Sequence, residues 1–183
     1  MRTILLLLLA LVAGCASRPP ALSSLDGQHY WQAEGRLALK SGQGGGNLNF
    51  IWAQLGASYR LALSGPLGVG NTELMVTPGQ VSLRHPERGL LQADSPEALL
   101  AESTGQQAPV SLLAHWIRAE AASDGARIER DANGRVLLIE EAGWTARYPE
   151  WQPDHPSLPR RIMVSGPDTR LTVLITRWQA LRR

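Results

Sequence analysis

The sequence predicts a mainly β domain of α+β character, in which one curved antiparallel sheet carries two helices on one side. Three observations lead to this fold class. Apolar and polar residues alternate with a period of two along most of the chain after residue 30, as in half-buried antiparallel strands. Two segments in the middle combine helical spacing with helix start signals. No internal repeat or second composition regime divides the chain, so the strands and helices are expected to share one core.

The alternation before the helices predicts five strands. In one of them Leu48, Phe50 and Trp52 share a face, which is the pattern of a strand with one buried side. The glycine-rich residues 42–46 are not followed by a helix and are expected to form a flexible hairpin loop. The predicted strands cover residues 36–40, 47–54, 58–64, 72–77 and 80–85.

Two helices are predicted next. The first starts at the Asp-Ser-Pro-Glu sequence of residues 94–97, which offers a capping side chain, Pro in the first turn and Glu close behind. Gly105 ends this helix, and the second helix opens at Pro109. The apolar face of the second helix is formed by Val110, Leu112, Leu113, Trp116 and Ile117.

The rest of the chain returns to strand patterns. An Asn-Gly pair at residues 133–134 is a strong hairpin signal, and residues 166–168 mark a final hairpin. Glu140 and Glu141 are adjacent, so they fall on opposite faces of their strand and are not expected to act as a pair. The predicted strands cover residues 126–130, 135–140, 144–148, 160–165 and 169–178.

Composition and motifs give no sign of an enzyme or of a nucleic-acid-binding protein. The net charge of the 183 residues is +2 at pH 7, and the arginines lack the interleaved aromatics of a nucleic-acid platform. The four histidines share no metal-ligand spacing, and the chain has no Walker phosphate loop and no Gly-x-Ser-x-Gly elbow. We therefore expect no catalytic residue, no metal and no cofactor.

The N-terminus has the layout of a secretory signal, with Arg2 before an apolar run from Ile4 to Ala13. A membrane-spanning helix needs about 20 apolar residues, and this run is shorter. The run and the small residues that lead into Cys15 resemble the bacterial lipobox. That resemblance implies a mature chain that begins at a lipidated Cys15, and Ala16 rather than Asp after it favours the outer membrane. An ordinary signal peptide followed by a free thiol is the alternative.

This N-terminus suggests three parts of the chain. Residues 1–14 are expected to be a lipoprotein signal peptide. Residues 15–29 hold Ser, Pro, Gly and Arg with little periodicity, as in a tether between a lipid anchor and a domain. Residues 30–183 are expected to form a single domain.

One loop holds apolar side chains among residues that favour tight turns. Its sequence, Gly-Pro-Leu-Gly-Val-Gly at residues 65–70, joins two predicted strands. Apolar side chains such as Leu67 and Val69 at a loop tip are either tucked under the loop or placed to contact something apolar. The residues alone favour tucking.

A set of short motifs follows in order along the chain. They are Trp31, Gly35-Arg36-Leu37-Ala38, Phe50-Ile51-Trp52-Ala53-Gln54, Tyr59-Arg60-Leu61, Gly65-Pro66-Leu67-Gly68, Thr72-Glu73-Leu74, Pro109-Val110-Ser111-Leu112-Leu113, Trp116-Ile117, Gly143-Trp144, Tyr148, Trp151, Leu158-Pro159 and Trp178. Together with the lipobox, this ordered set resembles the LolB family of outer-membrane lipoprotein receptors. The resemblance covers nearly the whole mature chain.

The resemblance implies both a fold and an activity. The fold is an incomplete antiparallel β-barrel of the LolA/LolB type, with helices covering its apolar concave face. The activity is to accept triacylated lipoproteins from the periplasmic carrier LolA and to insert them into the outer membrane, facing the periplasm. The implied partners are LolA, the acyl chains of the lipoprotein cargo and outer-membrane lipid, with the receptor as a monomer and without nucleic acid. The implied membrane-insertion loop is formed by Pro66, Leu67, Gly68 and Val69, with Leu67 exposed.

A receptor of this kind needs a dry apolar cavity for acyl chains. The candidates to line it are Leu48, Phe50, Trp52, Leu61, Leu63, Leu113, Trp116, Ile117 and Trp144. Plain core packing is the other interpretation of each of these residues. The alternative for the whole protein is a scaffold lipoprotein of the outer membrane that has the same fold and no acyl-transfer activity.

Overall fold

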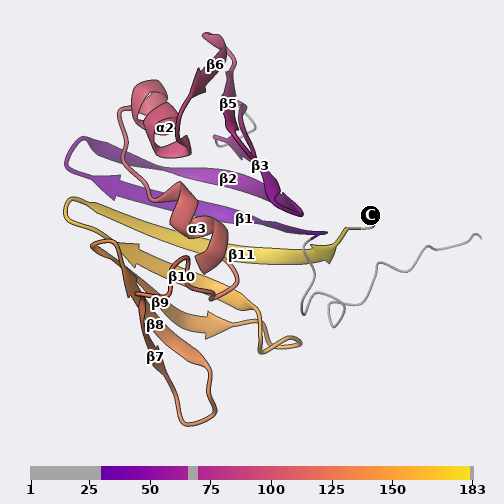
Figure 1. Ribbon diagram of the computed structural model, residues 1–183, viewed down its shortest axis with the longest axis vertical. Helices are drawn as coiled ribbons and strands as arrows, with labels where there is room; N and C mark the ends of the chain where they lie inside the picture. Colours follow the sequence, from indigo (N-terminus) through magenta and orange to yellow (C-terminus); the bar gives the residue numbers. More distant parts are fainter. Residues whose placement is uncertain (1–29, 66–69, 182–183) are drawn as a thin grey trace, which may run out of the picture.

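Eleven strands form one antiparallel sheet in the computed structural model, which describes residues 30–65 and 70–181. The strands are β1 (Tyr30–Ser41), β2 (Gly44–Leu55), β3 (Ser58–Ser64), β4 (Thr72–Thr77), β5 (Gln80–His85), β6 (Gly89–Ala93), β7 (Arg127–Arg130), β8 (Val136–Glu141), β9 (Trp144–Trp151), β10 (Pro159–Ser165) and β11 (Thr169–Ala180). Their order across the sheet is β6-β5-β4-β3-β2-β1-β11-β10-β9-β8-β7 (Figure 1). Because β6 and β7 do not pair with each other, the sheet is open.

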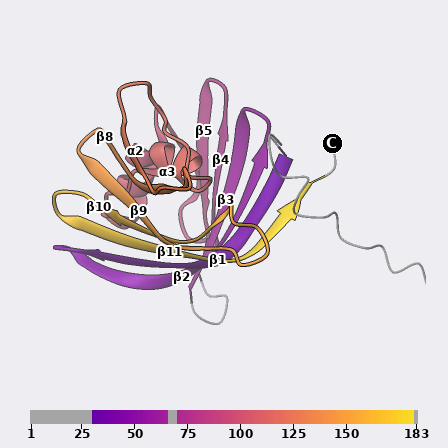
Figure 2. The same ribbon diagram turned by 90° about the horizontal axis from the view of Figure 1, so that it is seen from below.

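The sheet curves around two short helices, α2 (Pro96–Thr104) and α3 (Val110–Trp116). Both helices lie on its concave side, and Figure 2 shows the strands wrapping beneath them. This arrangement confirms the predicted fold class, an incomplete antiparallel barrel whose helices cover the concave face. Among the described residues, no helix has the length and apolar character needed to cross a membrane.

The centre of the sheet joins the two ends of the described chain. Strand β1 pairs with β2 on one side and with β11 on the other, so Leu37 lies opposite both Leu48 and Val173. This register lines up apolar side chains across three strands on the concave face. At Gly35, where the pairing with β11 shifts, a Cβ atom would lie 1.9 Å from the carbonyl oxygen of Leu174. The two backbones therefore approach closely enough that only glycine fits there.

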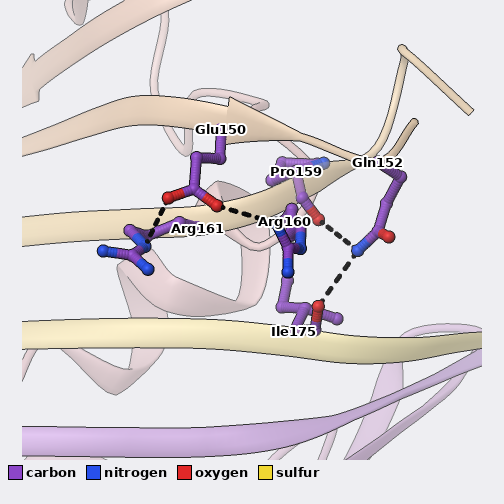
Figure 3. A network of polar contacts seen from close by, with 6 residues as sticks. All are labelled: Glu150, Gln152, Pro159, Arg160, Arg161 and Ile175. Carbon is purple, nitrogen blue, oxygen red and sulfur yellow. Dashed lines mark hydrogen bonds and ion pairs between the residues drawn. The ribbon is translucent and has the colours of Figure 1, made fainter.

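Polar contacts tie the end of β9 to β10 and β11 (Figure 3). Glu150 accepts a hydrogen bond from Arg160 Nη1 at 3.1 Å and forms an ion pair with Arg161 Nε at 3.0 Å. The Gln152 side-chain amide donates to the carbonyl oxygens of Pro159, at 3.4 Å, and Ile175, at 3.0 Å. These contacts hold the end of β9 to strands β10 and β11.

The structure corrects two sequence expectations. Gly44 to Gly46 belong to β2, so the expected loop over residues 42–46 is confined to its first part. A Cβ atom at Gly45 would lie 2.3 Å from the Leu39 carbonyl oxygen, so this close strand pairing requires glycine. Strand β6 was not expected, because its sequence Gly-Leu-Leu-Gln-Ala lacks alternation, and Leu90 is 58% exposed at this sheet edge.

Both helix starts follow from side-chain contacts. The Ser95 hydroxyl accepts a hydrogen bond from the Ala98 N–H at 3.1 Å, which confirms the expected cap of α2, and Gly105 ends that helix with a φ of 70°. Helix α3 has no capping side chain of its own at Pro109. Instead, Glu97 of α2 accepts hydrogen bonds from the N–H and the hydroxyl of Ser111, at 2.6 and 3.1 Å.

Candidate functional site

A cavity of about 280 Å³ lies between the concave face of the sheet and the helices. Its lining is almost entirely aliphatic, and its polar side chains are those of Thr72 and Gln106. The aliphatic lining is Leu37, Leu39, Leu48, Leu61, Leu63, Leu74, Leu83, Pro96, Leu100, Ala108, Val110, Leu113 and Leu171, with Gly70 at the wall. Since such a surface offers almost no hydrogen-bonding groups, it suits a flexible hydrocarbon ligand.

A second, smaller void of about 30 Å³ lies at the end of α3. Leu37, Leu61 and Leu113 line both spaces, so the two are adjacent. The small void is bordered by the rings of Phe50 and Trp52, which are nearly fully buried. The Trp52 ring also stacks on Tyr59, with 4.7 Å between ring centroids. The concave face is therefore well packed at the end of α3, whereas the larger cavity lies between the sheet and both helices, with Leu100 of α2 and Leu113 of α3 in its wall.

The structure places the candidate cavity residues in four positions. Leu48, Leu61, Leu63 and Leu113 line the cavity. Phe50, Trp52 and Ile117 border the small void. Trp116 is fully buried and borders neither space. Trp144 lies apart, in a surface groove of about 430 Å³ between the helices and the β8–β9 turn.

Other candidates lie outside the described residues. They are Cys15 and the four loop residues Pro66, Leu67, Gly68 and Val69. The two ends of that loop are described, and they lie at the cavity. Leu63 near the end of β3, and Gly70 and Thr72 on the other side of the loop, all line it. The end of β3 before the loop and the first described residues after it therefore both lie at the cavity wall.

A buried carboxylate behind α3 was not predicted as a functional group. Glu141, at the end of β8, is 8% exposed and accepts four hydrogen bonds. The donors are Trp116 Nε1 at 2.6 Å, the N–H of Ala122 at 3.0 Å, and the N–H and hydroxyl of Ser123 at 3.1 and 3.0 Å. Nearby, the Tyr148 hydroxyl donates to the Trp116 carbonyl oxygen at 3.0 Å. The sequence did carry a signal for this burial. Glu141 lies two residues after Ile139, so the two side chains are on the same face of β8, and Ile139 is buried.

Burial and hydrogen bonding act on these groups in opposite directions. Burial raises the pKa of Glu141, but the hydrogen bonds from Ala122, Trp116 and Ser123 outweigh it and leave that pKa below its ordinary value. Burial, and then the charge of Glu141, raise the pKa of Tyr148. At neutral pH the carboxylate is therefore ionised and the Tyr148 hydroxyl keeps its proton.

Polar contacts also link the segment between the helices to the sheet. The Ser41 hydroxyl, at the end of β1, donates to Gln106 Oε1 at 2.7 Å. Among the described residues, no cluster of His, Cys, Asp or Glu side chains could hold a metal ion. The chemistry that this site supports is thus the binding of apolar groups.

An open antiparallel sheet wrapped around a leucine-lined cavity defines a binding protein for apolar ligands rather than a protein that carries out covalent chemistry. The chain belongs to the LolB family: the family model described as "Outer membrane lipoprotein LolB" matches residues 29–178. This match confirms the resemblance noted in the sequence.

Relatives of the same description match most of the chain. The outer-membrane lipoprotein LolB of Chromohalobacter salexigens is 34% identical over 191 residues, which cover 96% of this chain and 89% of the relative. That of Pseudomonas aeruginosa (strain PAO1) is 37% identical over 160 residues, covering 86% and 77% of the two chains. A solved structure of a DUF1329 family protein from Desulfovibrio piger has a TM-score of 0.51 at 8% identity, covering 86% of this chain and 88% of that protein. The last match concerns the fold alone.

Proposed function

We propose that this protein is a receptor that accepts triacylated lipoproteins from the periplasmic carrier LolA and inserts them into the outer membrane. The observation that carries the proposal is the leucine-lined cavity between the sheet and the two helices, in a chain of the LolB family. The protein acts without an enzymatic step, as a monomer. Its lipidated Cys15 and the tether of residues 15–29 hold the domain of residues 30–183 at the membrane, after removal of the signal peptide of residues 1–14.

The hydrophobic effect explains why such a receptor needs a cavity. Each methylene group moved out of water contributes about 0.8 kcal/mol, so one long acyl chain exposed to water costs roughly 10 kcal/mol. A triacylated lipoprotein therefore passes from one apolar surface to another. Transfer proceeds without nucleotide if the acyl chains bind better here than in the carrier, and better again in the bilayer.

The cavity is too small in this structure to hold three acyl chains. Pockets for drug-sized ligands measure roughly 300–1,000 Å³, and three acyl chains need more room than the smallest of these. At about 280 Å³, the cavity must enlarge to accept them. The lining supports enlargement, because its aliphatic side chains make no hydrogen bonds that would be lost when the wall of the cavity moves.

The loop at residues 65–70 gives the receptor a route to the membrane. In our proposal Leu67, with Pro66, Gly68 and Val69, contacts lipid and guides the chains out. Support comes from the position of the loop ends, since Leu63 and Gly70 both line the cavity.

A transfer assay tests the proposal. A soluble form lacking residues 1–15 is mixed with LolA loaded with a triacylated lipoprotein, and each protein is then pulled down separately. We expect one-way movement of the lipoprotein onto this protein. If the lipoprotein stays on a competent carrier while this protein is folded, the scaffold interpretation replaces the receptor. Mass spectrometry of the mature N-terminus checks lipidation at Cys15, and light scattering checks the monomer.

A further inference from the structure

The two helices over the concave face attach to opposite halves of the open sheet. Helix α2 packs on β5 and β6, at one edge, and Leu99 is its fully buried contact (Figure 1). The end of α3 and the segment that follows it are bound instead to β8 and β9, near the other edge, through Glu141 and Tyr148. The helices also contact each other through Glu97 and Ser111, so moving the two halves apart would break this contact unless one helix leaves its own half of the sheet.

The attachment of α3 is strong and buried. One ionised carboxylate, Glu141, collects donors from Trp116 inside α3 and from Ala122 and Ser123 in the segment beyond it. Hydrogen bonds to an ionised group are roughly twice as strong as neutral ones, and removing the acceptor would leave the buried Nε1–H of Trp116 without a partner. These bonds hold in place both the Trp116 ring at the end of α3 and the segment at Ala122 and Ser123 that follows the helix.

The polar contacts of α2 are weaker, because they lie at the surface. The bonds from Ser111 to Glu97 are exposed, and so is the bond from Arg88 Nη1 to the Glu102 carbonyl oxygen at 3.0 Å. Water can replace each of them at little cost. The left-handed residue Gly105 then separates α2 from the segment that leads to α3. The cavity wall includes Leu100 of α2 as well as Val110 and Leu113 of α3, and the aromatic rings border only the smaller void at the end of α3.

We propose that Glu141 is a positioning residue that fixes α3 to β8 and β9, so that the cavity opens by movement of α2 away from a stationary α3. This inference rests on the proposed function for the identity of the ligand, which is a triacylated lipoprotein. Its claim about Glu141 concerns the protein itself and holds in the absence of ligand.

Distance measurements between spin labels test the proposal. Because Cys15 is the only cysteine of the sequence, its removal with the signal segment allows selective labelling. One label replaces exposed Arg170 on β11, and the second replaces either Glu102 on α2 or His115 on α3, both exposed. On addition of a synthetic triacylated lipopeptide, we expect the Glu102–Arg170 distance to shift and the His115–Arg170 distance to stay unchanged. An equal shift in both pairs would overturn the assignment of the moving helix.

The role of Glu141 is tested by E141Q against E140Q. The control is the neighbouring carboxylate, which faces outward and pairs with Arg127 at the surface. In E141Q the NH₂ group of the introduced side-chain amide would face N–H donors, so this variant is expected to broaden the His115–Arg170 distribution even without ligand. The control E140Q is expected to leave that distribution unchanged. A third variant, S123A, removes one of the four donors and is expected to have an intermediate effect.

The outcomes separate this proposal from the receptor function. A residue that only stabilised the fold would lower the unfolding temperature in E141Q and leave the His115–Arg170 distribution as it is, which would overturn the positioning role. If the lipopeptide does not bind at all, as measured by native mass spectrometry, the proposed function fails. The ligand-free comparison of E141Q with E140Q would still decide the role of Glu141.

Discussion

Placing a charge on the cavity wall should strongly weaken the binding of acyl chains while leaving the fold intact. Leu48 is the most useful position, because it is half-buried and lines the cavity near the exposed end of β2. In Leu48→Glu, the carboxylate can reach water in the empty protein, so we expect a loss of only about 1 kcal/mol in unfolding free energy. A bound hydrocarbon chain removes that access to water.

The expected magnitude follows from two losses. Full burial of a leucine side chain contributes about 1.5–3 kcal/mol, and a half-buried one gives up roughly half of that when it is replaced. Forcing a carboxylate against hydrocarbon adds a desolvation penalty of several kcal/mol, which is reduced because the side chain can turn toward the solvent. A net loss of about 3 kcal/mol corresponds to an affinity on the order of 100-fold weaker.

The same strand supplies the control. Ile51 lies on the opposite face of β2 and is 42% exposed, so Ile51→Glu introduces the same charge away from the cavity. Titration with a fluorescent acyl probe measures both variants, and thermal unfolding confirms that both are folded. The account predicts weak binding for Leu48→Glu and normal binding for Ile51→Glu. Normal binding by a folded Leu48→Glu, or an equal loss in both variants, would refute the reasoning.

Three further predictions follow from other parts of the molecule. Leu67→Glu should accept cargo from LolA but fail to deposit it in liposomes; normal deposition would remove the role of the loop. Glu141 has a lowered pKa, so its contribution to stability is fully present above the ordinary carboxyl value of 4.5 and is lost as pH falls toward the folded value. In urea unfolding between pH 7 and pH 3, the unfolding free energy of the wild type should therefore fall more steeply with decreasing pH than that of E141Q, and parallel curves would contradict this. Leu99→Ala removes a fully buried side chain and should lower the unfolding free energy by about 2–5 kcal/mol, whereas a change below about 1 kcal/mol would show that α2 is not packed as described.

Period-two alternation was enough to predict most of the sheet, because each strand has one face in a shared core. It failed where side chains carry no information about the strand. Gly45 has no side chain to alternate, and its place in β2 depends on pairing with Lys40 across the hairpin. Strand β6 lies at an edge, where Leu90 is exposed and the inside–outside pattern is lost.

The candidate site was predicted in part for the same reason. Strand parity identified Leu48, Leu61 and Leu63 as members of one face, and the structure brings them to one cavity. Parity could not show that Leu171 joins them, because this requires β11 to pair with β1 across the length of the chain. Strand parity also could not show which part of the concave face is tightly packed and which part holds the cavity, since that depends on where the helices pack.

Glu141 shows a different limit. Its adjacency to Glu140 correctly placed the two carboxylates on opposite faces, which ruled out a paired role. The inward face held the more informative residue, because a carboxylate among buried apolar side chains needs donors. Those donors come from Trp116 and from the segment after α3, and nothing in the local sequence connects them to β8.

The central claim is that acyl chains occupy the cavity between the sheet and the two helices, and photo-crosslinking tests it most directly. A triacylated lipopeptide with a photoreactive group near the end of one acyl chain is bound to the protein, irradiated, and mapped by mass spectrometry. The account predicts adducts on cavity residues such as Leu63, Leu100 and Leu171. Adducts confined to the outer face of the sheet, at exposed side chains such as Ile51 and Met163, would contradict it.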